Sequence, residues 1–413
     1  EIIDKQFLAF SDNRQTAAFF ATYLENTYRD SIVRRIMHEI MEEHPDDFAK
    51  GIPIKDFANL LFRKFEKNNV FPGVSDDEIE KKVWLYVLKE ISNYKAKNSL
   101  LKKGNMYFEV DFNLPKNIAS LNKDEVNDLF KLLSRHMMKD LAVDTGINFT
   151  KAEENEMSPS GFVKGYDKTA AGYTYITGWS PEQGKTNKRL KYITKLFDGD
   201  EELARRLLNS MWDFMSNNGF IKRVSLGARN AYKLNYEKIR VKSTQQLYCC
   251  NECKNITPYN IKGICENPLC QGTLEPYDDE ILLKDDHYHK LYTELNAVPM
   301  RVNEHTAQLS SDKAYEYQKL FKEKIINVLS CSTTFEMGVD VGSLETVFMR
   351  NMPPSPANYA QRAGRAGRSI KAAAYAITFC PNSSHDLNYF KNPVAMIKGT
   401  INPPYFNVSN DKI

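Results

Sequence analysis

The sequence of 413 residues lacks long hydrophobic runs and carries little net charge. No apolar stretch approaches the roughly 20 residues that a membrane-spanning helix needs. The formal net charge is only +3, so a surface that attracts a polyanion must be a local patch. The first residues also lack the basic region and cleavage pattern of a secretory signal peptide. These absences indicate a cytoplasmic protein. Because the chain begins almost directly in a buried-looking strand, we expect it to be a piece of a longer protein.

Cysteine is scarce except in one short segment. Five of the seven cysteines fall between Cys249 and Cys270, which is typical of a metal site in a reducing compartment rather than of a disulfide framework. Cys250 and Cys253 form a C-x2-C pair, and Cys265 and Cys270 form a C-x4-C pair eleven residues later. This spacing predicts a closed, structural Zn²⁺ site with four thiolate ligands. Cys249 is a competing ligand, although it lengthens the first gap to three.

Strand and helix patterns alternate at the two ends of the chain. Residues 5–10 form an apolar run, residues 11–13 a turn and helix cap, and a helical pattern follows. Near the C-terminus the alternation resumes, with predicted strands at 297–302, 325–329, 346–349 and 373–379 and a helix around 314–321. This alternation predicts a parallel α/β sheet that binds its ligands at the carboxyl ends of the strands.

The middle of the sequence has the character of an insertion. Ser75 and Glu78 are spaced as a capping box for a helix, and a second apolar helical stripe runs over 126–141. A polar stretch at 145–164 is typical of a linker. A helix over 203–215 then precedes two arms of a predicted hairpin, which resembles a winged helix. The hairpin is basic, with Lys222, Arg223, Arg229 and Lys233, and such a hairpin either contacts nucleic acid or only packs against neighbours.

Residues 330–369 carry the most specific pattern. Ser332, Thr333 and Thr334 follow a buried strand, where short hydroxyl side chains can donate hydrogen bonds to a phosphate. Gly338 permits close backbone approach, and Asp340 can accept a hydrogen bond from a ribose hydroxyl. Further on, Ser355 and Pro356 start a predicted helix. Gln361, Arg365 and Arg368 are spaced four and three apart, which predicts that they share one helical face. Guanidinium groups there are suited to binding phosphate oxygens.

These segments resemble motifs V and VI of superfamily 2 helicases of the DEAD/DEAH-box-like type, carried by the second RecA-like domain. The resemblance extends to large bacterial helicases with a cysteine-rich module, including some linked to phage defence. It implies a RecA-like parallel sheet with helices on both faces. A mostly helical insertion with winged-helix-like and zinc-ribbon-like parts would interrupt that sheet.

The resemblance also implies roles for individual residues. Arg365, Arg368 and Gln361 would act in catalysis on ATP and Mg²⁺ held by the first RecA-like domain, and Gly338, Asp340 and Arg362 would contact the nucleotide. Residues 7–15 are similar to motif IV, which would place Ser11 and Arg14 at the nucleic-acid backbone. Residues 304–310 are similar to a segment between motifs IV and V, which assigns His305 to nucleic acid. Ser332, Thr333, Thr334, Lys222 and Arg223 complete the expected nucleic-acid contacts.

An ATPase of this family also needs a P-loop and an acidic DExx motif, and neither is convincing here. The only GK[ST] sequence is Gly184-Lys185-Thr186, and Trp179 stands where the first P-loop glycine belongs. Asp278-Asp279-Glu280 follows a turn-like segment rather than a buried strand. We therefore expect this chain to be inactive alone and to require the N-terminal RecA-like domain of the same protein.

The sequence thus predicts the C-terminal motor half of an ATP-dependent helicase or translocase, with DNA favoured by resemblance. The alternative is a non-unwinding module that binds nucleic acid or docks proteins in a defence or repair complex. We expect residues 1–30 and 296–400 to form one discontinuous domain, with a helical insertion at 31–144, linkers at 145–165 and 279–295, a winged-helix-like part at 166–246, a zinc module at 247–278 and an exit segment at 401–413.

Overall fold

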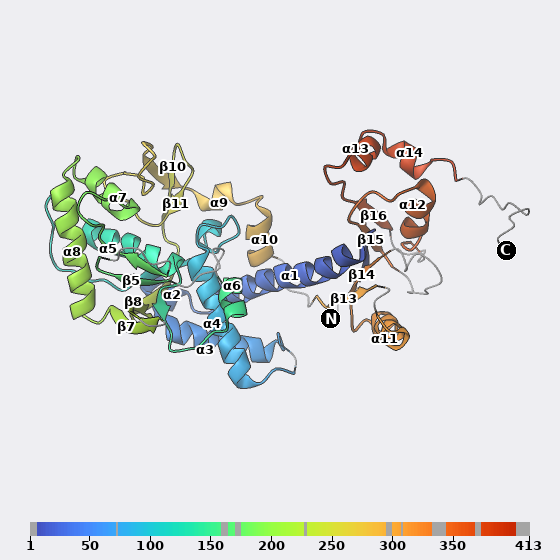
Figure 1. The fold of residues 1–413 in the computed structure, drawn as a ribbon, viewed down its shortest axis with the longest axis horizontal. Helices are drawn as coiled ribbons and strands as arrows, with labels where there is room; N and C mark the ends of the chain where they lie inside the picture. Colours follow the sequence, from blue (N-terminus) through green and yellow to red (C-terminus); the bar gives the residue numbers. More distant parts are fainter. Residues whose placement is uncertain are drawn as a thin grey trace, which may run out of the picture. The chain divides into compact units, whose positions relative to one another are not determined.

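The computed structural model divides into two compact units (Figure 1). One contains residues 1–31 and 297–413, and the other contains residues 32–296. The structure describes residues 6–71, 73–157, 164–169, 175–226, 229–294, 300–306, 309–332, 344–367 and 373–401. Among these residues, no helix combines the length and apolar character required to cross a membrane.

The first unit is built on a five-stranded parallel sheet in the order β13-β14-β1-β15-β16. The central strand β1 comes from the N-terminus, and its Leu8 is in register with Leu329 on one side and Val347 on the other. The parallel sheet predicted from the sequence is therefore present, and its domain is discontinuous. The strands are β1 (Phe7–Phe10), β13 (Val302–His305), β14 (Val328–Cys331), β15 (Thr346–Met349) and β16 (Tyr375–Thr378).

Alternating side chains of these strands pack against helices on both faces, as the two-residue period of a strand requires. Leu8, Leu329 and Val347 share one apolar cluster with Phe321 of α11 (Ser311–Lys322), and α12 (Pro356–Ala363) adds Tyr359 and Ala363. On the other face, the first turns of α1 (Arg14–Glu43) cover the sheet. There the Ser330 hydroxyl donates to the Ala17 carbonyl at 2.7 Å. Two further helices, α13 (Ser384–Lys391) and α14 (Pro393–Ile397), follow β16.

The second unit is mostly helical and has one extensive hydrophobic core, which runs from Val33 to Tyr292. This core continues across the boundaries expected at residues 145–165 and at residue 246. Its helices are α2 (Pro45–Lys50), α3 (Ile54–Lys67), α4 (Asp76–Ser92), α5 (Lys123–Lys139), α6 (Lys151–Met157), α7 (Lys188–Leu196), α8 (Glu201–Asn217), α9 (Asp279–Leu282) and α10 (His287–Thr293), with short 3₁₀ turns η1 (Leu101–Lys103) and η2 (Tyr236–Lys238).

Three small sheets complete this unit. The antiparallel β7–β8 hairpin follows α8, as the helix-plus-hairpin pattern predicts, and Lys222 is opposite Lys233 in it. Strand β8 also pairs with β4 and β5, so the hairpin belongs to a larger sheet. The strands are β4 (Val143–Asp144), β5 (Gly165–Asp167), β6 (Ile176–Gly178), β7 (Ile221–Leu226) and β8 (Arg229–Asn235); β2 (Ile52–Pro53), β3 (Met106–Val110) and β9 (Ile239–Ser243); and β10 (Leu247–Cys250), β11 (Ile256–Thr257) and β12 (Leu274–Tyr277).

Two local predictions were wrong. The polar stretch expected to be a linker contains α6, because Met157 is buried in the core and its carbonyl accepts a hydrogen bond from the Ser92 hydroxyl. Ser75 does precede α4, but its side chain makes no capping hydrogen bond. A capping box forms instead at α5, where the Asn122 side chain accepts from the Asp124 and Glu125 amides and Glu125 accepts from the Asn122 amide.

This difference between the two helix starts gives a matched test. Asn122→Ala removes a side chain that satisfies two helix N–H groups, so we expect it to lower the free energy of unfolding by about 1 kcal/mol. Ser75→Ala removes a side chain without a capping bond and should change it by less than about 0.5 kcal/mol. Urea unfolding followed by fluorescence measures both, since Trp84, Trp179 and Trp212 are all buried in the second unit. Equal effects of the two substitutions would contradict the assignment.

Candidate functional sites

The first candidate site lies at the carboxyl edge of the parallel sheet. The strand order reverses at β1. On one side of β1 the chain forms the outer strand β13 and then β14. It then crosses β1 and forms β15 and β16 on the other side. Open α/β sheets bind ligands outside the carboxyl ends of the strands where such a reversal occurs. Residues 11–14 follow β1, Ser332 follows β14 and Asn351 follows β15, so the loops at this edge carry the segments singled out in the sequence.

Arg362 and Asp12 form an ion pair at the reversal point. The Arg362 side chain has 0% of its surface exposed and that of Asp12 has 32%, and the Arg362 guanidinium lies 2.5 Å from Asp12 Oδ1 and over the Phe10 ring. The side-chain amide of Asn351 donates to Asp12 Oδ2, and its oxygen accepts from the Asp12 amide at 3.3 Å. In this structure Arg362 thus holds the loop after β1, and its expected contact with the nucleotide stays a prediction.

Four of the residues expected to contact nucleic acid from this unit lie at the ends of neighbouring strands or just after them: Ser11, Arg14, His305 and Ser332. The Ser11 amide donates to the Cys331 carbonyl at 2.9 Å, and the Ser332 amide lies 3.4 Å from the His305 carbonyl. Ser11, Ser332 and His305 are buried, whereas Arg14, the first residue of α1, is exposed. The His305 ring nitrogen Nε2 lies 3.0 Å from the Gln318 side-chain amide, and burial lowers the pKa of His305, which favours the neutral imidazole. The structure thus brings these residues together, and their roles stay predictions.

The arginine-rich segment begins as predicted and ends differently. Ser355 caps α12 by accepting from the Asn358 amide, and Pro356 occupies the first turn. The helix ends at Ala363, after which Gly367 adopts a left-handed φ of +83° and its amide donates to Leu344. The prediction that Gln361 and Arg365 share a helical face is therefore wrong, because Arg365 lies beyond the helix. The second glycine of the motif leads the chain back to the sheet.

Arg365 follows α12 directly after Gly364, and the next residue, Ala366, forms a parallel bridge with Leu344. Burial raises the pKa of the Cys331 thiol at the end of β14, and the positive charge of Arg365 opposes this increase. Five residues of the predicted site lie outside the described part of the chain: Thr333, Thr334, Gly338, Asp340 and Arg368.

Three positioning residues escaped prediction: Asp12, Asn351 and Asp386. Asp386 accepts from the Met352 amide at 2.7 Å and from the Ser383 hydroxyl, so the start of α13 holds the loop after β15. Asp12 comes two residues after the end of a predicted strand, and this position could have indicated a residue at the carboxyl edge of the sheet. Asn351 and Asp386 had no local signal, because their partners lie 339 and 34 positions away in the sequence.

The second candidate site is the cysteine cluster of the other unit. The sulfur atoms of Cys250, Cys253, Cys265 and Cys270 all lie within 4.8 Å of one another. Two pairs, Cys250 with Cys270 and Cys253 with Cys265, are 3.5 Å apart. Tetrahedral zinc with Zn–S bonds of about 2.3 Å separates its sulfurs by about 3.8 Å, so the geometry fits this ion. Cys249 stays outside the group, and its sulfur contacts the Cys250 carbonyl instead.

Backbone groups donate hydrogen bonds to two of these thiols, whereas burial raises the pKa of a third, Cys265. The Gly272 amide donates to Cys270 Sγ at 3.3 Å. A Cβ at Gly272 would lie 2.6 Å from Cys250 Sγ, so the cluster requires glycine there. Although burial raises the pKa of Cys250, hydrogen bonds from the backbone of Cys253 and Glu252 outweigh it and hold the pKa at about 7. The thiolate is the ligand form.

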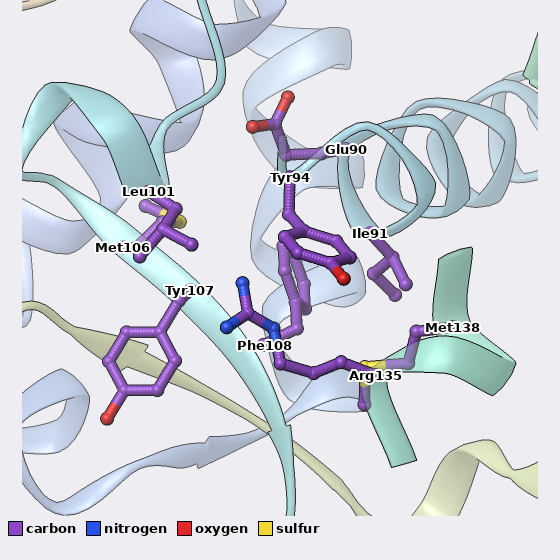
Figure 2. A pocket seen from close by; sticks show the side chains of 9 residues that line it. All are labelled: Glu90, Ile91, Tyr94, Leu101, Met106, Tyr107, Phe108, Arg135 and Met138. Atoms are coloured by element: carbon purple, nitrogen blue, oxygen red, sulfur yellow. The ribbon is translucent and has the colours of Figure 1, made fainter. Parts of the chain in front are cut away.

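The basic hairpin has one exposed and one partly paired residue among its predicted contacts. Arg223 is exposed, while the Lys222 ammonium lies 3.6 Å from Glu237 and over the Tyr236 ring. Gly184 lies in an exposed turn. An enclosed cavity elsewhere in this unit is lined by Tyr94, Arg135 and their neighbours (Figure 2). Its volume of about 10 Å³ accommodates roughly one water molecule, so it is no ligand site.

Comparison with known proteins identifies several that are similar to parts of this chain. Residues 279–370 match the family model described as the helicase conserved C-terminal domain. The Druantia protein DruE of Escherichia coli is 31% identical over 273 residues, which cover 59% of this chain and 14% of that protein. The ATP-dependent helicase Lhr-Core of Saccharolobus solfataricus is 32% identical over 71 residues, 17% of this chain and 8% of the relative.

Among solved structures, the Mycobacterium smegmatis helicase Lhr bound to ssDNA and AMP-PNP is 26% identical, with a TM-score of 0.23 over 25% of this chain and 14% of that chain. The chain spans only 14% of the length of DruE and 8% of that of Lhr-Core. The sequence matches and the parallel sheet support the predicted resemblance to the C-terminal half of a superfamily 2 helicase. The predicted α/β fold class with a parallel sheet is confirmed, whereas the zinc-bearing type of helicase and the parts expected in the insertion stay predictions.

The Asp12–Arg362 ion pair gives a stability prediction for the first unit. Asp12→Ala removes a carboxylate from the fully buried Arg362, but Asp12 is itself 32% exposed. We therefore expect a loss of about 1–3 kcal/mol, as for a hydrogen bond to a charged group, rather than the larger cost of breaking a fully buried pair. The rate of amide hydrogen exchange in β1 and β14 should rise by the factor that corresponds to the lost free energy of unfolding. Glu316→Ala on α11 removes an exposed carboxylate of the same unit and should change stability by less than about 0.5 kcal/mol. Unchanged protection in Asp12→Ala would show that the pair does not stabilise the sheet.

Proposed function

We propose that this chain supplies the C-terminal motor domain of an ATP-dependent helicase or translocase that acts on DNA. The observation that carries the proposal is that residues 279–370, which match the helicase conserved C-terminal domain, include the arginine-rich segment and help to form the parallel sheet. Arg365 lies in the turn after α12, and we expect its guanidinium to reach a phosphate presented by a facing domain. The Arg362–Asp12 pair and the Asp386 contacts support this role, because they hold the loops around this segment.

In this proposal, the N-terminal RecA-like domain of the same protein binds ATP with Mg²⁺. Arg365 and Arg368 then contact the γ-phosphate and stabilise the charge that develops during transfer, as arginine fingers do. Gln361 orients the reacting groups, and Gly338 and Asp340 contact the nucleotide. Magnesium, when bound, neutralises phosphate charge. Ser11, Arg14, His305, Ser332, Thr333 and Thr334 form the contacts to the nucleic-acid backbone, with Lys222 and Arg223 as contacts from the other unit.

We further propose that Cys250, Cys253, Cys265 and Cys270 hold a structural Zn²⁺ ion. All four ligands are thiols and leave no open coordination position, so the ion would stabilise the β10–β12 sheet rather than take part in the reaction. Removal of the metal should unfold this sheet locally.

The arginines provide the test of the motor function. In the full-length protein, Arg365→Ala and Arg368→Ala should each lower the nucleic-acid-stimulated ATPase rate by about 10³-fold, which corresponds to roughly 4 kcal/mol. Arg206→Ala, an exposed arginine of α8, is the matched control and should leave the rate unchanged. Stimulation by single-stranded DNA and by RNA, compared side by side, tests the choice of substrate.

An ATPase rate in either arginine variant that equals the Arg206→Ala rate would refute the proposed motor role. A protein whose ATPase responds to nucleic acid and which moves along a strand without separating a forked duplex would favour the non-unwinding alternative.

The zinc site is tested by elemental analysis of the purified protein. We expect about one zinc ion per chain of the wild type. The zinc content should fall strongly in Cys265→Ser and stay unchanged in Cys249→Ser, because Cys265 belongs to the four-cysteine cluster and Cys249 does not. A chelator should increase proteolysis within residues 247–277 of the wild type. Zinc-free protein with an unchanged proteolytic pattern, or equal loss of metal in the two variants, would exclude the four-cysteine site.

A further inference from the structure

Among the many lysines of the second unit, we group together six that have no role in the proposed motor. We call them the lysine surface: Lys95, Lys97, Lys102, Lys139, Lys164 and Lys188. Lys95 and Lys97 follow α4, Lys102 lies in η1, Lys139 ends α5, Lys164 precedes β5 and Lys188 begins α7. All six are exposed or half-buried. In a chain with a net charge of only +3, this group is a local concentration of positive charge.

Contacts of neighbouring residues bring these segments together. The Lys164 amide donates to the carbonyl of Asp140, next to Lys139, at 3.0 Å. The Arg189 guanidinium, next to Lys188, lies 5.3 Å from the Tyr166 ring, whose hydroxyl donates to the Asp140 carboxylate. The Tyr94 ring, next to Lys95, lies 3.9 Å from the guanidinium of Arg135, one turn before Lys139 on α5.

The pKa shifts agree with this placement. Burial lowers the pKa of Lys139, the charges of Lys95, Lys188 and Lys164 lower it further, and the charge of Asp140 opposes them. Burial and the charges of Lys95, Lys103 and Lys97 likewise lower the pKa of Lys102.

Few carboxylates face this region. Glu266 Oε1 lies 2.8 Å from the Lys95 ammonium and also accepts from Asn255. Asp140 lies 3.6 Å from the Lys164 ammonium and accepts the Tyr166 hydroxyl hydrogen bond at 2.7 Å. Within the described residues, Lys97, Lys102, Lys139 and Lys188 have no carboxylate at ion-pair distance.

Contacts also join the surface to the cysteine cluster. Glu266 directly follows Cys265, so its ion pair with Lys95 joins the cluster to the segment after α4. The Lys195 ammonium donates to the Cys270 carbonyl at 2.7 Å. Figure 2 shows Arg135 of α5 beside Tyr94, the residue before Lys95. Lys188 stands in the first turn of α7, where a positive charge opposes the helix dipole. A residue that destabilises its own helix in this way is expected at functional positions.

We propose that the lysine surface binds the phosphate backbone of nucleic acid, as a second contact region outside the sheet edge. This proposal rests on the proposed function, which brings nucleic acid to the protein. Lysine contacts to phosphates dominate binding that is independent of sequence, whereas the centres of protein–protein interfaces are depleted of lysine. The chemistry of the surface therefore fits a polyphosphate backbone better than a folded protein partner.

The test uses three lysines of the surface that have no ion pair. In the full-length protein, the triple variant Lys97→Gln, Lys139→Gln and Lys188→Gln should bind a fluorescent single-stranded oligodeoxythymidine more weakly than the wild type, without nucleotide present. The slope of log affinity against log salt should fall by about 2, since each lost contact to a single strand removes roughly 0.7. The corresponding lysine-to-arginine triple variant should retain both affinity and slope.

The matched control is the triple variant Lys55→Gln, Lys67→Gln and Lys116→Gln, which removes the same charge from exposed positions of the same unit. It should bind the oligonucleotide with the wild-type slope. The surface variant should keep its maximal ATPase rate at saturating DNA while requiring more DNA for half-maximal stimulation.

Equal slopes for the surface and control variants would overturn the proposal. So would a surface variant that loses binding to poly-glutamate and keeps its binding to the oligonucleotide, because the surface would then recognise an acidic protein. A wild type without nucleic-acid-stimulated ATPase would refute the proposed function, while the binding comparison would still test the lysine surface on its own.

Discussion

The first unit depends on the ion pair between Asp12 and the fully buried Arg362, which joins two points 350 positions apart in the sequence. A charge in a buried environment is stable only with a partner held at close range. The loop after β1 and the end of α12 must therefore stay together. Asn351 and Asp386 extend the same constraint to the loop after β15, so contacts on both sides hold this edge of the sheet.

The chain between these two points explains why such a constraint is needed. The central strand β1 is separated from its neighbours β14 and β15 in sequence by the whole second unit. The entropy of closing a long connection rises only slowly with its length, and the second unit has its own core, so the sheet tolerates the insertion. Within that second unit, the Lys95–Glu266 pair plays a comparable part by joining the cysteine cluster to the helical core.

Local sequence patterns predicted which helices and strands form better than they predicted where helices end and which side chains are buried. Strand β15 was predicted to the residue, and Ser355 with Pro356 marked the start of α12, because both signals lie within a few positions. The end of α12 was predicted wrongly, since Gly367 and the pairing of Ala366 with Leu344 stop the helix through a contact with a distant segment. The pairing of Arg362 with Asp12 was missed for a similar reason: a motif arginine has the same sequence signal whether it faces a nucleotide or an aspartate of its own chain.

The sequence by itself determined the alternating α/β pattern, the arginine-rich segment that resembles motif VI of the helicases, and the four cysteines whose spacing suits one metal ion. These properties depend on neighbouring residues, and short-range spacing encodes them directly. Tertiary structure alone decided that Arg362 is buried and pairs with Asp12, that β1 occupies the centre of the sheet, and that segments far apart in the sequence carry the lysines of the proposed surface. Each of those outcomes depends on contacts between residues far apart in the chain, which no local pattern specifies.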